Sequence, residues 1–547
     1  MRTPGTTHPL PPDRRSQSGS GRLLRSLVAV LCAALAVFAS ACGTAPAPAA
    51  ARTSTAAALP PGGVPGVRVP TLVWTDAGDG SQQATAQVPY DYARPRGRTL
   101  GLHLVRLPAA DPAHRIGTLF VNPGGPGQSA DAFVRTLGTA LLPPEVLARY
   151  DLVGVDPRGT GGSSPLSCTG SADELHTLPY ATAQAFPIDA AQQAEAVAQV
   201  TRYAQQCRAR NGDLLDHVGT LAFARDLDVL RAAVGDARIN LVGFSYGSFL
   251  GQVVANTFPD RTGALVLDGI VDPAWATGAR GTISWARANA DIGGWETLQR
   301  FFRLCAQAGP QGCAFAADGD PARTFAELAT RLRTTPLALA PAGQPPRALG
   351  YDDLVIYTTA LLFSAPAWPV LGELLHGAAT GDAQAVSALL DLVPPPSAEY
   401  FDANTAITCG DSDNPRDPGT YGAVGRQRDA TVARYTGSLW AFRALACAPW
   451  LGRSTERYTG PWTARTHTPV LLLNNRYDPA TPYRNAVRVH DLLPNSALLT
   501  VDGVGHGALL FSSCARDATA KYLLTGALPP PGAVCAQDRG PFDQPPA

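Results

Sequence analysis

Short apolar runs alternate with helical patterns along this chain, and this alternation constrains its fold more than any other feature. Each run is followed by turn residues, as is typical of buried parallel strands. Between two of the runs, Leu227, Leu230 and Val234 recur at helical spacing. The alternation predicts an α/β protein with a doubly wound, mostly parallel sheet. The predicted strands are Thr118–Asn122, Asp151–Asp156, Ile239–Gly243, Ala264–Asp268, Val470–Asn474 and Ala497–Val501.

The alternation is interrupted once, by a long segment between Asp268 and Val470. This segment contains helical patterns that Pro-rich stretches divide. Because an insertion of this length within a sheet needs a core of its own, we expect it to form a second, mainly helical lobe. We therefore predict one sheet domain in two parts, residues 70–272 and 465–540, and an inserted domain at residues 273–464.

One serine stands in a pattern that suits a nucleophile, Gly243-Phe244-Ser245-Tyr246-Gly247. The pattern lies between the predicted strand and a helix-like segment at 249–256. A nucleophilic serine needs this context because it must stand on a tight strand-to-helix turn, where glycines remove side chains that would collide. Since G-x-S-x-G alone arises often by chance, the alternative is a glycine-rich turn without chemistry. The context favours Ser245 as the nucleophile.

A nucleophilic serine also needs a general base, which a carboxylate orients. His506 lies in a glycine cluster after the last predicted strand, and Asp478 follows the strand before it. The competing carboxylates are Asp268, one strand earlier, and Asp502, which is too close to His506 in sequence to reach around its ring. Asp478 gives the chain order Ser, Asp, His. We predict a catalytic triad of Ser245, Asp478 and His506.

An oxyanion hole requires backbone N–H groups that face the developing negative charge. The loop Asn122-Pro123-Gly124-Gly125-Pro126-Gly127 follows the first predicted strand. A loop at this position can supply one donor, and the residue after the nucleophile supplies the other. The predicted donors are therefore Gly125 (or Gly124) and Tyr246. The alternative is a purely structural Gly/Pro turn.

The N-terminus contains the ordered parts of a secretory signal. Arginines precede an apolar run at 27–39, which is too short to span a bilayer comfortably. The run ends in Ala39-Ser40-Ala41-Cys42-Gly43, which resembles a bacterial lipobox, although Ala39 stands where Leu is usual. We predict a signal at residues 1–42 with lipidation of Cys42, the alternative being ordinary cleavage after a small residue. Residues 43–69, rich in Ala, Pro and Thr, are predicted to be a linker.

Export explains the remaining cysteines, because an even number of cysteines in an exported protein indicates disulfides. Eight cysteines permit about 105 pairings, so the sequence alone does not prove one. Sequential neighbours close the shortest loops, and on that ground we predict the pairs Cys168–Cys207, Cys305–Cys313, Cys409–Cys447 and Cys514–Cys535.

The charge balance and the cysteine spacing exclude other classes of partner. Lys plus Arg equals Asp plus Glu at 44 each, so the formal net charge is zero and nothing favours nucleic acid. The chain has no C-x-x-C pattern and no histidine at ligand spacing, so we expect no metal site. We expect a monomer that contacts a membrane only through an N-terminal lipid anchor.

Taken in order, these motifs resemble those of the secreted tripeptidyl aminopeptidases of actinobacteria and their mycobacterial surface-hydrolase relatives, a branch of the α/β-hydrolases near the prolyl aminopeptidases. The resemblance runs from about residue 70 to residue 540. It rests on the 122–127 loop, Asp156-Pro157-Arg158-Gly159-Thr160-Gly161, the serine turn, Ala406-Ile407-Thr408-Cys409-Gly410-Asp411, Asp478–Pro482 and Gly505-His506-Gly507.

The resemblance implies an α/β-hydrolase fold with a helical lid inserted after the strand that ends near Asp268. It also implies acyl transfer through an ester on Ser245, without a cofactor, and it supports the four sequential disulfides. An aminopeptidase needs a fixed carboxylate for the substrate ammonium group, and the lid candidates are Asp411, Glu296 and Glu373. The expected activity is the release of short peptides, chiefly tripeptides, from free N-termini outside the membrane. The alternatives are a cell-envelope esterase, lipase or limited endoprotease of the same fold, and a non-catalytic binding protein, which the intact triad disfavours.

Overall fold

The computed structural model describes residues 64–169, 174, 177–182, 184–279, 281–339, 347–393, 397–454 and 456–543. The predicted signal, the lipidation site Cys42 and most of the predicted linker lie outside these residues. Within the described residues, no helix is both long and apolar enough to cross a bilayer.

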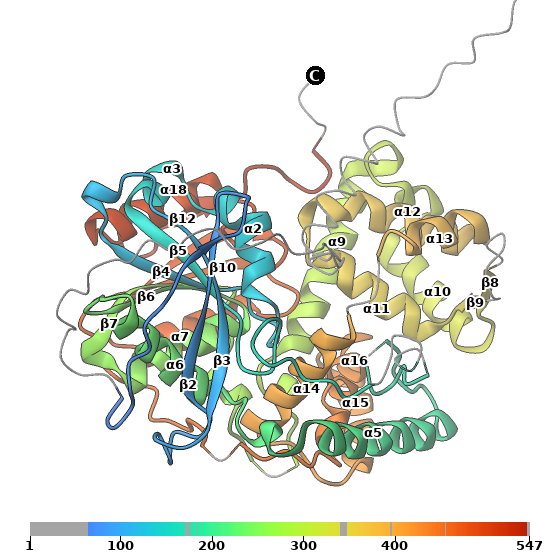
Figure 1. Ribbon diagram of the computed structural model, residues 1–547. Coiled ribbons are helices and arrows are strands. Elements are labelled where there is room, and N and C mark those ends of the chain that lie inside the picture. Colours follow the sequence, from blue (N-terminus) through green and yellow to red (C-terminus); the bar gives the residue numbers. More distant parts are fainter. Residues whose placement is uncertain are drawn as a thin grey trace, which may run out of the picture.

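A ten-stranded mixed sheet forms the centre of the protein, in the order β1-β2-β3-β5-β4-β6-β7-β10-β11-β12 (Figure 1). From β5 to β12 neighbouring strands are parallel, whereas β1, β2 and β3 form an antiparallel edge. The strands are β1 Thr75–Asp76, β2 Gln82–Pro89, β3 Thr99–Leu107, β4 Gly117–Asn122, β5 Tyr150–Val155, β6 Ile239–Phe244, β7 Thr262–Asp268, β10 Val470–Tyr477, β11 Ser496–Val504 and β12 Val534–Ala536.

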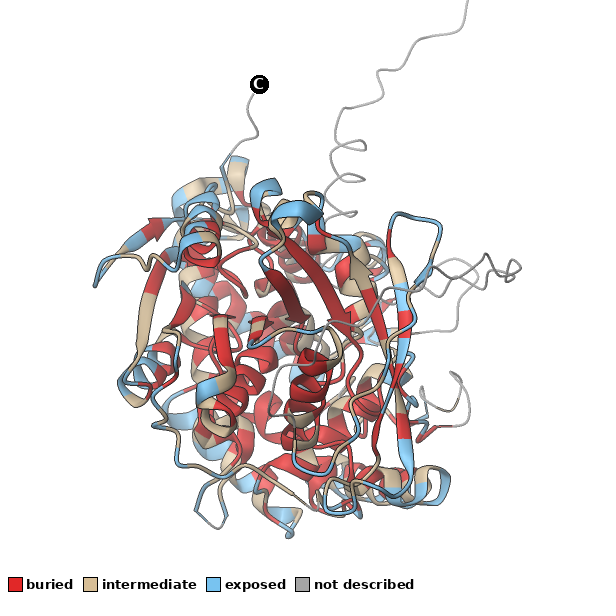
Figure 2. Cartoon of the chain, turned by 60° about the vertical axis from the view of Figure 1, so that its left-hand side comes forward, coloured by how far each residue is buried: buried red, intermediate tan, exposed pale blue. Residues whose placement is uncertain are grey.

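Helices cover both faces of the sheet, as a doubly wound fold requires. Side chains of α2, α3 and α18 pack on one face, and those of α5, α6, α7 and α17 contribute to the core on the other. Figure 2 shows the central strands buried between these layers. The helices are α2 Ala130–Leu141, α3 Pro144–Arg149, α5 Ala190–Asn211, α6 Thr220–Ala233, α7 Tyr246–Thr257, α17 Tyr483–Leu492 and α18 Ser513–Thr525.

The segment between β7 and β10 is mainly helical, and its described residues contain no strand of the main sheet. In Figure 1, α9 to α13 form a lobe to the right of the sheet, and α14, α15 and α16 lie below it near α5. Its elements are α8 Ser284–Arg287, α9 Ala290–Gly312, α10 Pro321–Thr334, α11 Tyr351–Leu362, α12 Trp368–Thr380, α13 Ala383–Leu390, α14 Ala398–Asp411, α15 Gly419–Thr431, α16 Thr436–Phe442 and the hairpin β8 Leu337–Leu339 with β9 Arg347–Leu349. The prediction of an α/β-hydrolase fold with an inserted helical region is confirmed.

The eight cysteines of the folded body form the four sequential pairs that the sequence predicted: Cys168–Cys207, Cys305–Cys313, Cys409–Cys447 and Cys514–Cys535. Two of these bridges lie within the inserted segment, and none joins that segment to the sheet domain. The disulfide framework therefore fastens each part of the molecule locally.

A fully buried ion pair joins the loop after β5 to helix α6. The Arg158 guanidinium donates from Nε and Nη2 to the two carboxylate oxygens of Asp226, at 2.6 and 2.7 Å. Both side chains are 0% exposed, and the Tyr92 hydroxyl also donates to Asp226. Because every member of this cluster has a partner, the two charges are tolerated in the core.

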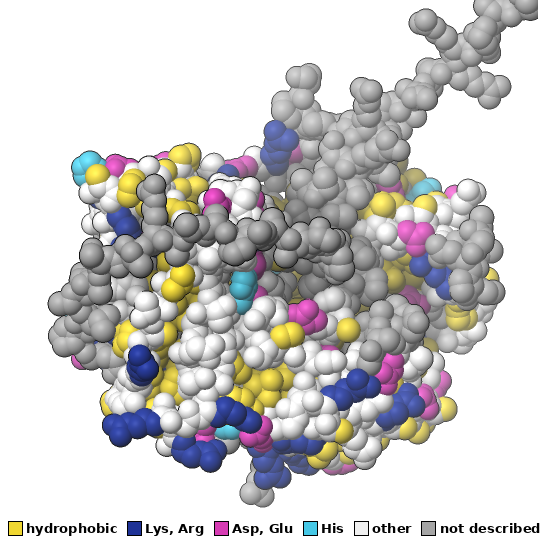
Figure 3. Space-filling model, viewed as in Figure 1, with side chains coloured by type: hydrophobic (Ala, Val, Ile, Leu, Met, Phe, Trp, Pro, Cys, Tyr) yellow, Lys and Arg dark blue, Asp and Glu magenta, His cyan; other side chains and the backbone are white. Residues whose placement is uncertain are grey.

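Surface charges are mixed in sign. In Figure 3, basic side chains gather along the lower edge of the face shown, with acidic side chains among them. This distribution agrees with the zero formal net charge.

Candidate active site

Ser245 stands on the turn between β6 and α7. Its backbone has φ 55° and ψ −120°, a conformation that non-glycine residues rarely adopt. Neighbouring glycines make the turn possible, since a Cβ on Gly243 would lie 2.3 Å from the Gly247 carbonyl oxygen. The Ser245 N–H donates to the Asp268 carbonyl at 2.8 Å, which fixes the turn to the end of β7. The serine side chain is thus held above the carboxyl ends of the parallel strands.

The loop after β4 approaches this turn closely. Gly124 has φ 99°, and a Cβ there would lie 2.5 Å from the Phe244 carbonyl oxygen and 2.9 Å from the Ser245 Cβ. The Gly124 N–H already donates to the Asn122 side chain at 3.1 Å. Among the described residues, the N–H groups of Gly125 and Tyr246 have no intramolecular acceptor. Of the two glycines predicted from the sequence, Gly125 is therefore the one that remains available as an oxyanion donor with Tyr246.

His506 and Asp478 meet beside the serine turn. The His506 Nδ1 lies 2.9 and 2.8 Å from the two carboxylate oxygens of Asp478, whose side chain is 0% exposed. The N–H groups of Ala480 and Thr481 donate to the same carboxylate. With Nδ1 held in this way, Nε2 is the nitrogen available to a serine hydroxyl. No hydrogen bond joins Ser245 and His506 among the described contacts, and such bonds often tighten only when substrate is bound.

Asp268, the competing carboxylate in the sequence, makes different contacts. Its two carboxylate oxygens accept the N–H groups of Ala508 and Leu509 at 2.8 and 2.9 Å. It therefore holds the loop that carries His506 but makes no hydrogen bond to the imidazole among the described contacts. The geometry assigns the orienting role to Asp478 and a positioning role to Asp268.

The electrostatics of this cluster set the protonation of the base. Burial by itself lowers the pKa of His506, but the charge and hydrogen bond of Asp478 and the charge of Asp268 outweigh it, so the pKa lies above the ordinary value of 6.5. Burial raises the pKa of Asp268 to about 6, although two backbone N–H donors oppose that shift. Because the two groups interact, the protonation of one affects that of the other.

We expect the acid limb of the kcat/KM profile to have its midpoint above pH 6.5 and a slope steeper than one proton. The base must be neutral, so activity rises as His506 loses its proton and as Asp268 becomes ionised. Asp268→Asn removes one titration and one negative charge. It should reduce the slope to one and move the midpoint to lower pH, because less negative charge stabilises the imidazolium.

The control for this profile is Asp502→Asn, which removes an exposed carboxylate four residues before His506 in the chain. It should leave the profile unchanged. An Asp268→Asn enzyme whose midpoint moved to higher pH would contradict the assignment.

Helix α14 of the inserted segment lies directly on the oxyanion loop. A Cβ on Gly127 would lie 2.7 Å from the Ala403 Cβ, and one on Gly125 would lie 3.1 Å from the Tyr400 ring. The Asn404 amide donates to the Pro126 carbonyl at 3.0 Å. The inserted segment thus forms a lid over the serine, and the sequence alone did not indicate which of its helices would do so.

Aromatic side chains from the lid line the other side of the cluster. The Phe363 ring packs edge-on against the His506 imidazole at a centroid distance of 5.1 Å. The backbone carbonyl of Phe363 also accepts the backbone N–H of His506. Trp440 and Trp285 pack together with Phe363 and with Ala480, two residues after Asp478. This wall places apolar side chains beside the base.

The three carboxylates proposed for the substrate amine lie elsewhere. Asp411 is only 3% exposed and accepts hydrogen bonds from the Thr220 N–H and hydroxyl, while Thr220 also contacts the Tyr246 hydroxyl. Burial raises the Asp411 pKa to about 6. Glu296 is partly exposed and pairs with Arg484, and Glu373 is exposed on α12. Asp411 thus uses one carboxylate oxygen to fasten α14 to Thr220 beneath Tyr246, while its other oxygen is buried and has no hydrogen-bond partner among the described residues. Its role as the site of the substrate amine stays a prediction.

The sequence missed a different carboxylate, Glu399, which stands in the first turn of α14 next to Tyr400. It is exposed, and one of its oxygens accepts the Gly161 N–H at 2.5 Å. Its only sequence signal was its position just after a Pro-rich stretch, which does not distinguish it from a surface residue.

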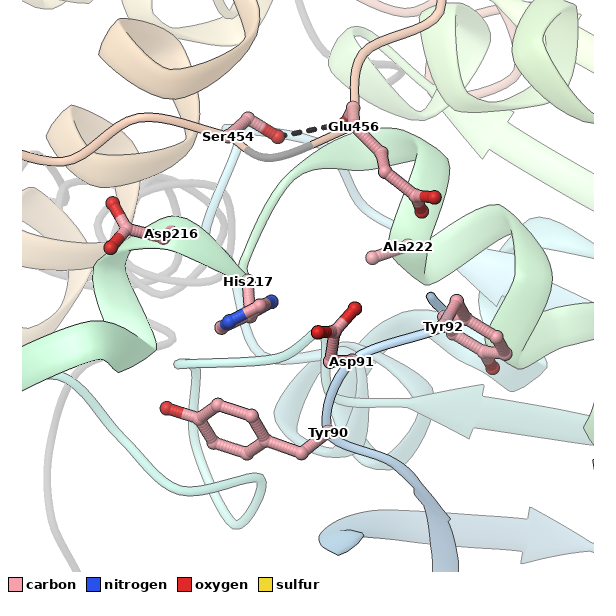
Figure 4. A pocket seen from close by; sticks show the side chains of 8 residues that line it. All are labelled: Tyr90, Asp91, Tyr92, Asp216, His217, Ala222, Ser454 and Glu456. Atoms are coloured by element: carbon pink, nitrogen blue, oxygen red, sulfur yellow. Dashed lines mark hydrogen bonds between the residues drawn. The ribbon is translucent and has the colours of Figure 1, made fainter. Parts of the chain in front are cut away.

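Two other cavities do not contain the triad. A groove of about 910 Å³ is bounded by segments near residues 278–282, 409–420 and 447–457. A cavity of about 10 Å³ lies among Tyr90, Asp91, Tyr92, Asp216, His217, Ala222, Ser454 and Glu456, whose side chains are shown in Figure 4. The second is too small for a substrate. Over the described ranges, no cluster of three His, Cys, Asp or Glu side chains is arranged to hold a metal ion.

Comparisons with known proteins agree on one group of enzymes. Residues 117–286 match the alpha/beta hydrolase fold family, and residues 433–535 match the family described as TAP-like protein. The chain is 32% identical to the serine protease Hip1 of Mycobacterium tuberculosis, over 82% of this chain and 86% of that protein. It is 31% identical to the tripeptidyl aminopeptidase of Streptomyces coelicolor, over 83% of each.

Other similar proteins are named for different activities. Carboxylesterase B of Mycobacterium tuberculosis is 32% identical over 83% of this chain and 86% of that protein. Among solved structures, the proline iminopeptidase of Mycobacterium smegmatis aligns with a TM-score of 0.33 and 14% identity, over 80% of this chain and 97% of that chain.

Proposed function

This chain belongs to the TAP-like family of α/β-hydrolases and is a serine hydrolase, and from that premise we propose that it is a tripeptidyl aminopeptidase. The observation that supports this most is the position of α14 across the oxyanion loop. Because the lid encloses the serine, a chain end reaches it more readily than a loop of a folded protein does. One of the relatives named above is a tripeptidyl aminopeptidase.

The proposed reaction uses the triad in two acyl transfers. His506 Nε2 accepts the Ser245 hydroxyl proton as Oγ attacks the scissile carbonyl, and the N–H groups of Gly125 and Tyr246 receive the oxyanion. The imidazolium, held by Asp478, then protonates the leaving amine. Water attacks the ester on Ser245, with His506 acting again as the base.

We propose Glu399 as the carboxylate that binds the substrate ammonium group. It is exposed, lies in the lid helix that covers the oxyanion loop, and adjoins Tyr400, which contacts Gly125. Its remaining oxygen is on the protein surface rather than in the core. A charge-assisted hydrogen bond to this group would fix the distance between the free N-terminus and Ser245.

The test compares a free-amine tripeptide p-nitroanilide with its N-acetylated twin and with p-nitrophenyl butyrate. We expect the wild-type enzyme to cleave only the free-amine member of the peptide pair efficiently. Glu399→Gln should raise KM for that peptide about tenfold, as expected for loss of one charge-assisted contact, and leave the ester unaffected. Glu296→Gln is the matched control and should change neither substrate.

A preference for the blocked peptide or for the ester would replace the proposal with its alternative. That alternative, a carboxylesterase or limited endoprotease of the same fold, is favoured by the similarity to carboxylesterase B. Equal losses on peptide and ester in Glu399→Gln would leave the aminopeptidase activity in place but reject this residue as the amine site.

We further propose that the protein acts outside the cytoplasmic membrane, in secreted or lipid-anchored form. The signal-like segment at residues 1–42 and the lipobox-like sequence around Cys42 support export. The four disulfides support it as well, because such bonds persist in oxidising compartments.

A further inference from the structure

Arg443 follows the last residue of α16 and lies in the lid next to two side chains already described. Its guanidinium carbon is 5.2 Å from the centroid of the Trp440 ring, and its charge acts on the Tyr400 phenol. Tyr400 contacts the oxyanion loop at Gly125, and Trp440 belongs to the aromatic wall that reaches His506 through Phe363. Arg443 is therefore linked to the His506 side of the site through Trp440, and it acts electrostatically on Tyr400, which borders the oxyanion loop.

Among the described residues, no carboxylate pairs with this guanidinium, and it makes no side-chain hydrogen bond. Its carbon lies over the Trp440 ring, and its charge opposes the rise that burial causes in the pKa of Tyr400. Arg158, Arg231 and Arg428 also lie in or near the core, and each pairs with an aspartate. Because an enclosed cation without a partner is costly, Arg443 is an exception that needs a physical reason.

The surroundings of Arg443 indicate that it faces a cleft. Its guanidinium carbon lies over the Trp440 ring and burial lowers its pKa, yet the residue keeps intermediate solvent exposure. A side chain on the outer surface would be exposed without desolvation, and one in the core would be desolvated without exposure. The same combination is found at His506 and Tyr400. Tyr400 borders the oxyanion loop, His506 belongs to the triad, and Arg443 stacks on Trp440, which packs with Phe363 beside His506, so all three side chains border the space above Ser245.

We propose that Arg443 binds a carboxylate of the substrate, so that the enzyme selects peptides carrying a negative charge within reach of the scissile bond. A guanidinium offers paired N–H donors that match a carboxylate, and Trp440 supports its plane from one side. The partner that the protein does not provide would then come from the substrate. The carboxylate has two possible sources, namely an acidic side chain in the released tripeptide or the C-terminus of a short leaving peptide.

This inference rests on the proposed peptidase function and adds a second charged contact to it. Glu399 precedes Tyr400 in α14, the charge of Arg443 acts on Tyr400, and Glu399 and Arg443 carry opposite charges. A peptide with a free ammonium group and a nearby carboxylate would satisfy both residues, whereas an uncharged ester would satisfy neither.

The experiment uses matched substrate pairs that differ only in charge. Tripeptide p-nitroanilides with Glu or Gln at each of the three positions test a side-chain carboxylate. Short alanine peptides with a free acid or an amide at the C-terminus, cleaved and quantified by mass spectrometry, test the leaving group. We expect kcat/KM to be about tenfold or more higher for the charged member in one of the two arms.

Arg443→Met should bring that ratio close to one, and Arg443→Lys should retain part of it because it keeps the charge but loses the paired geometry. Hydrolysis of p-nitrophenyl butyrate, which carries no carboxylate, should stay within about twofold of wild type. The matched control is Arg434→Met, an exposed arginine whose guanidinium carbon lies 5.1 Å from the Tyr435 ring centroid. It should leave the charge preference intact.

Wild-type enzyme without charge preference in either arm would overturn the proposal, as would an Arg443→Met enzyme that keeps the preference. If Arg443→Met does not fold, the wild-type ratios and Arg443→Lys still decide. An Arg443-dependent preference for blocked, carboxylate-bearing peptides would reject the aminopeptidase function and retain this inference.

Discussion

Replacing Ser245 with alanine is expected to lower kcat by about 10⁶-fold while leaving substrate binding nearly unchanged. The acyl-enzyme route disappears with the hydroxyl, and the residual rate comes from the oxyanion donors and substrate positioning alone. Steady-state hydrolysis of the free-amine tripeptide anilide measures the loss. A fluorophosphonate probe should label wild-type enzyme at one serine and leave Ser245→Ala unlabelled.

Asp478→Asn tests whether Asp478 orients the imidazole of His506. It should lower kcat by about 10⁴-fold, because the amide favours the wrong imidazole tautomer. Asp502→Asn is the matched control, since its carboxylate is exposed and pairs only with Arg476 among the described residues. It should retain wild-type activity. If Asp268→Asn proved as damaging as Asp478→Asn on a folded enzyme, the division of roles between these two aspartates would be wrong.

The second large effect concerns stability. Asp226→Asn should lower the free energy of unfolding by about 3–5 kcal/mol, because it leaves the Arg158 charge in the core without a counter-ion. The Arg158 guanidinium also donates to the carbonyl oxygens of Pro89 and Tyr90, so the loss would loosen the contact between the β2 end and the loop after β5. Urea unfolding followed by tryptophan fluorescence measures this change.

The control is Glu327→Gln, which breaks the pair of Glu327 with Arg323 on the surface of α10. These side chains are 64% and 67% exposed, so no measurable change in stability is expected. Equal free energies of unfolding for the Asp226→Asn and Glu327→Gln proteins would contradict the prediction, because the buried Arg158 charge would then be stabilised without Asp226.

The sheet could be predicted because its central strands are buried on both faces and therefore read as continuous apolar runs. All six predicted strands are present, as β4, β5, β6, β7, β10 and β11, and differ from the prediction only at their ends. The antiparallel edge was missed, since the outer strands do not form such runs. In β2, Gln82–Pro89, buried and exposed residues alternate instead.

The residues of the site likewise divide into those that the sequence predicted and those that it missed. Ser245, Asp478 and His506 follow strands directly, so the fold determines their position and local sequence patterns identify them. Tyr400 and the two residues proposed to bind substrate charges, Glu399 and Arg443, come from the lid, and only packing of the lid on the sheet domain sets their position. Asp411 shows how little a motif says about side-chain contacts. A recognisable motif surrounds it, yet its carboxylate accepts hydrogen bonds from Thr220.

The connectivity of the disulfides has a consequence for how the chain matures. A polypeptide that enters an oxidising compartment from its N-terminus presents its cysteines in sequence, and here each pair is complete before the first cysteine of the next one arrives. Thiols that oxidise in order of arrival therefore form the native bridges directly. Nested or interleaved pairs would instead require thiol–disulfide exchange to correct early errors. If the chain is exported as proposed, it should for this reason mature with little dependence on a disulfide isomerase.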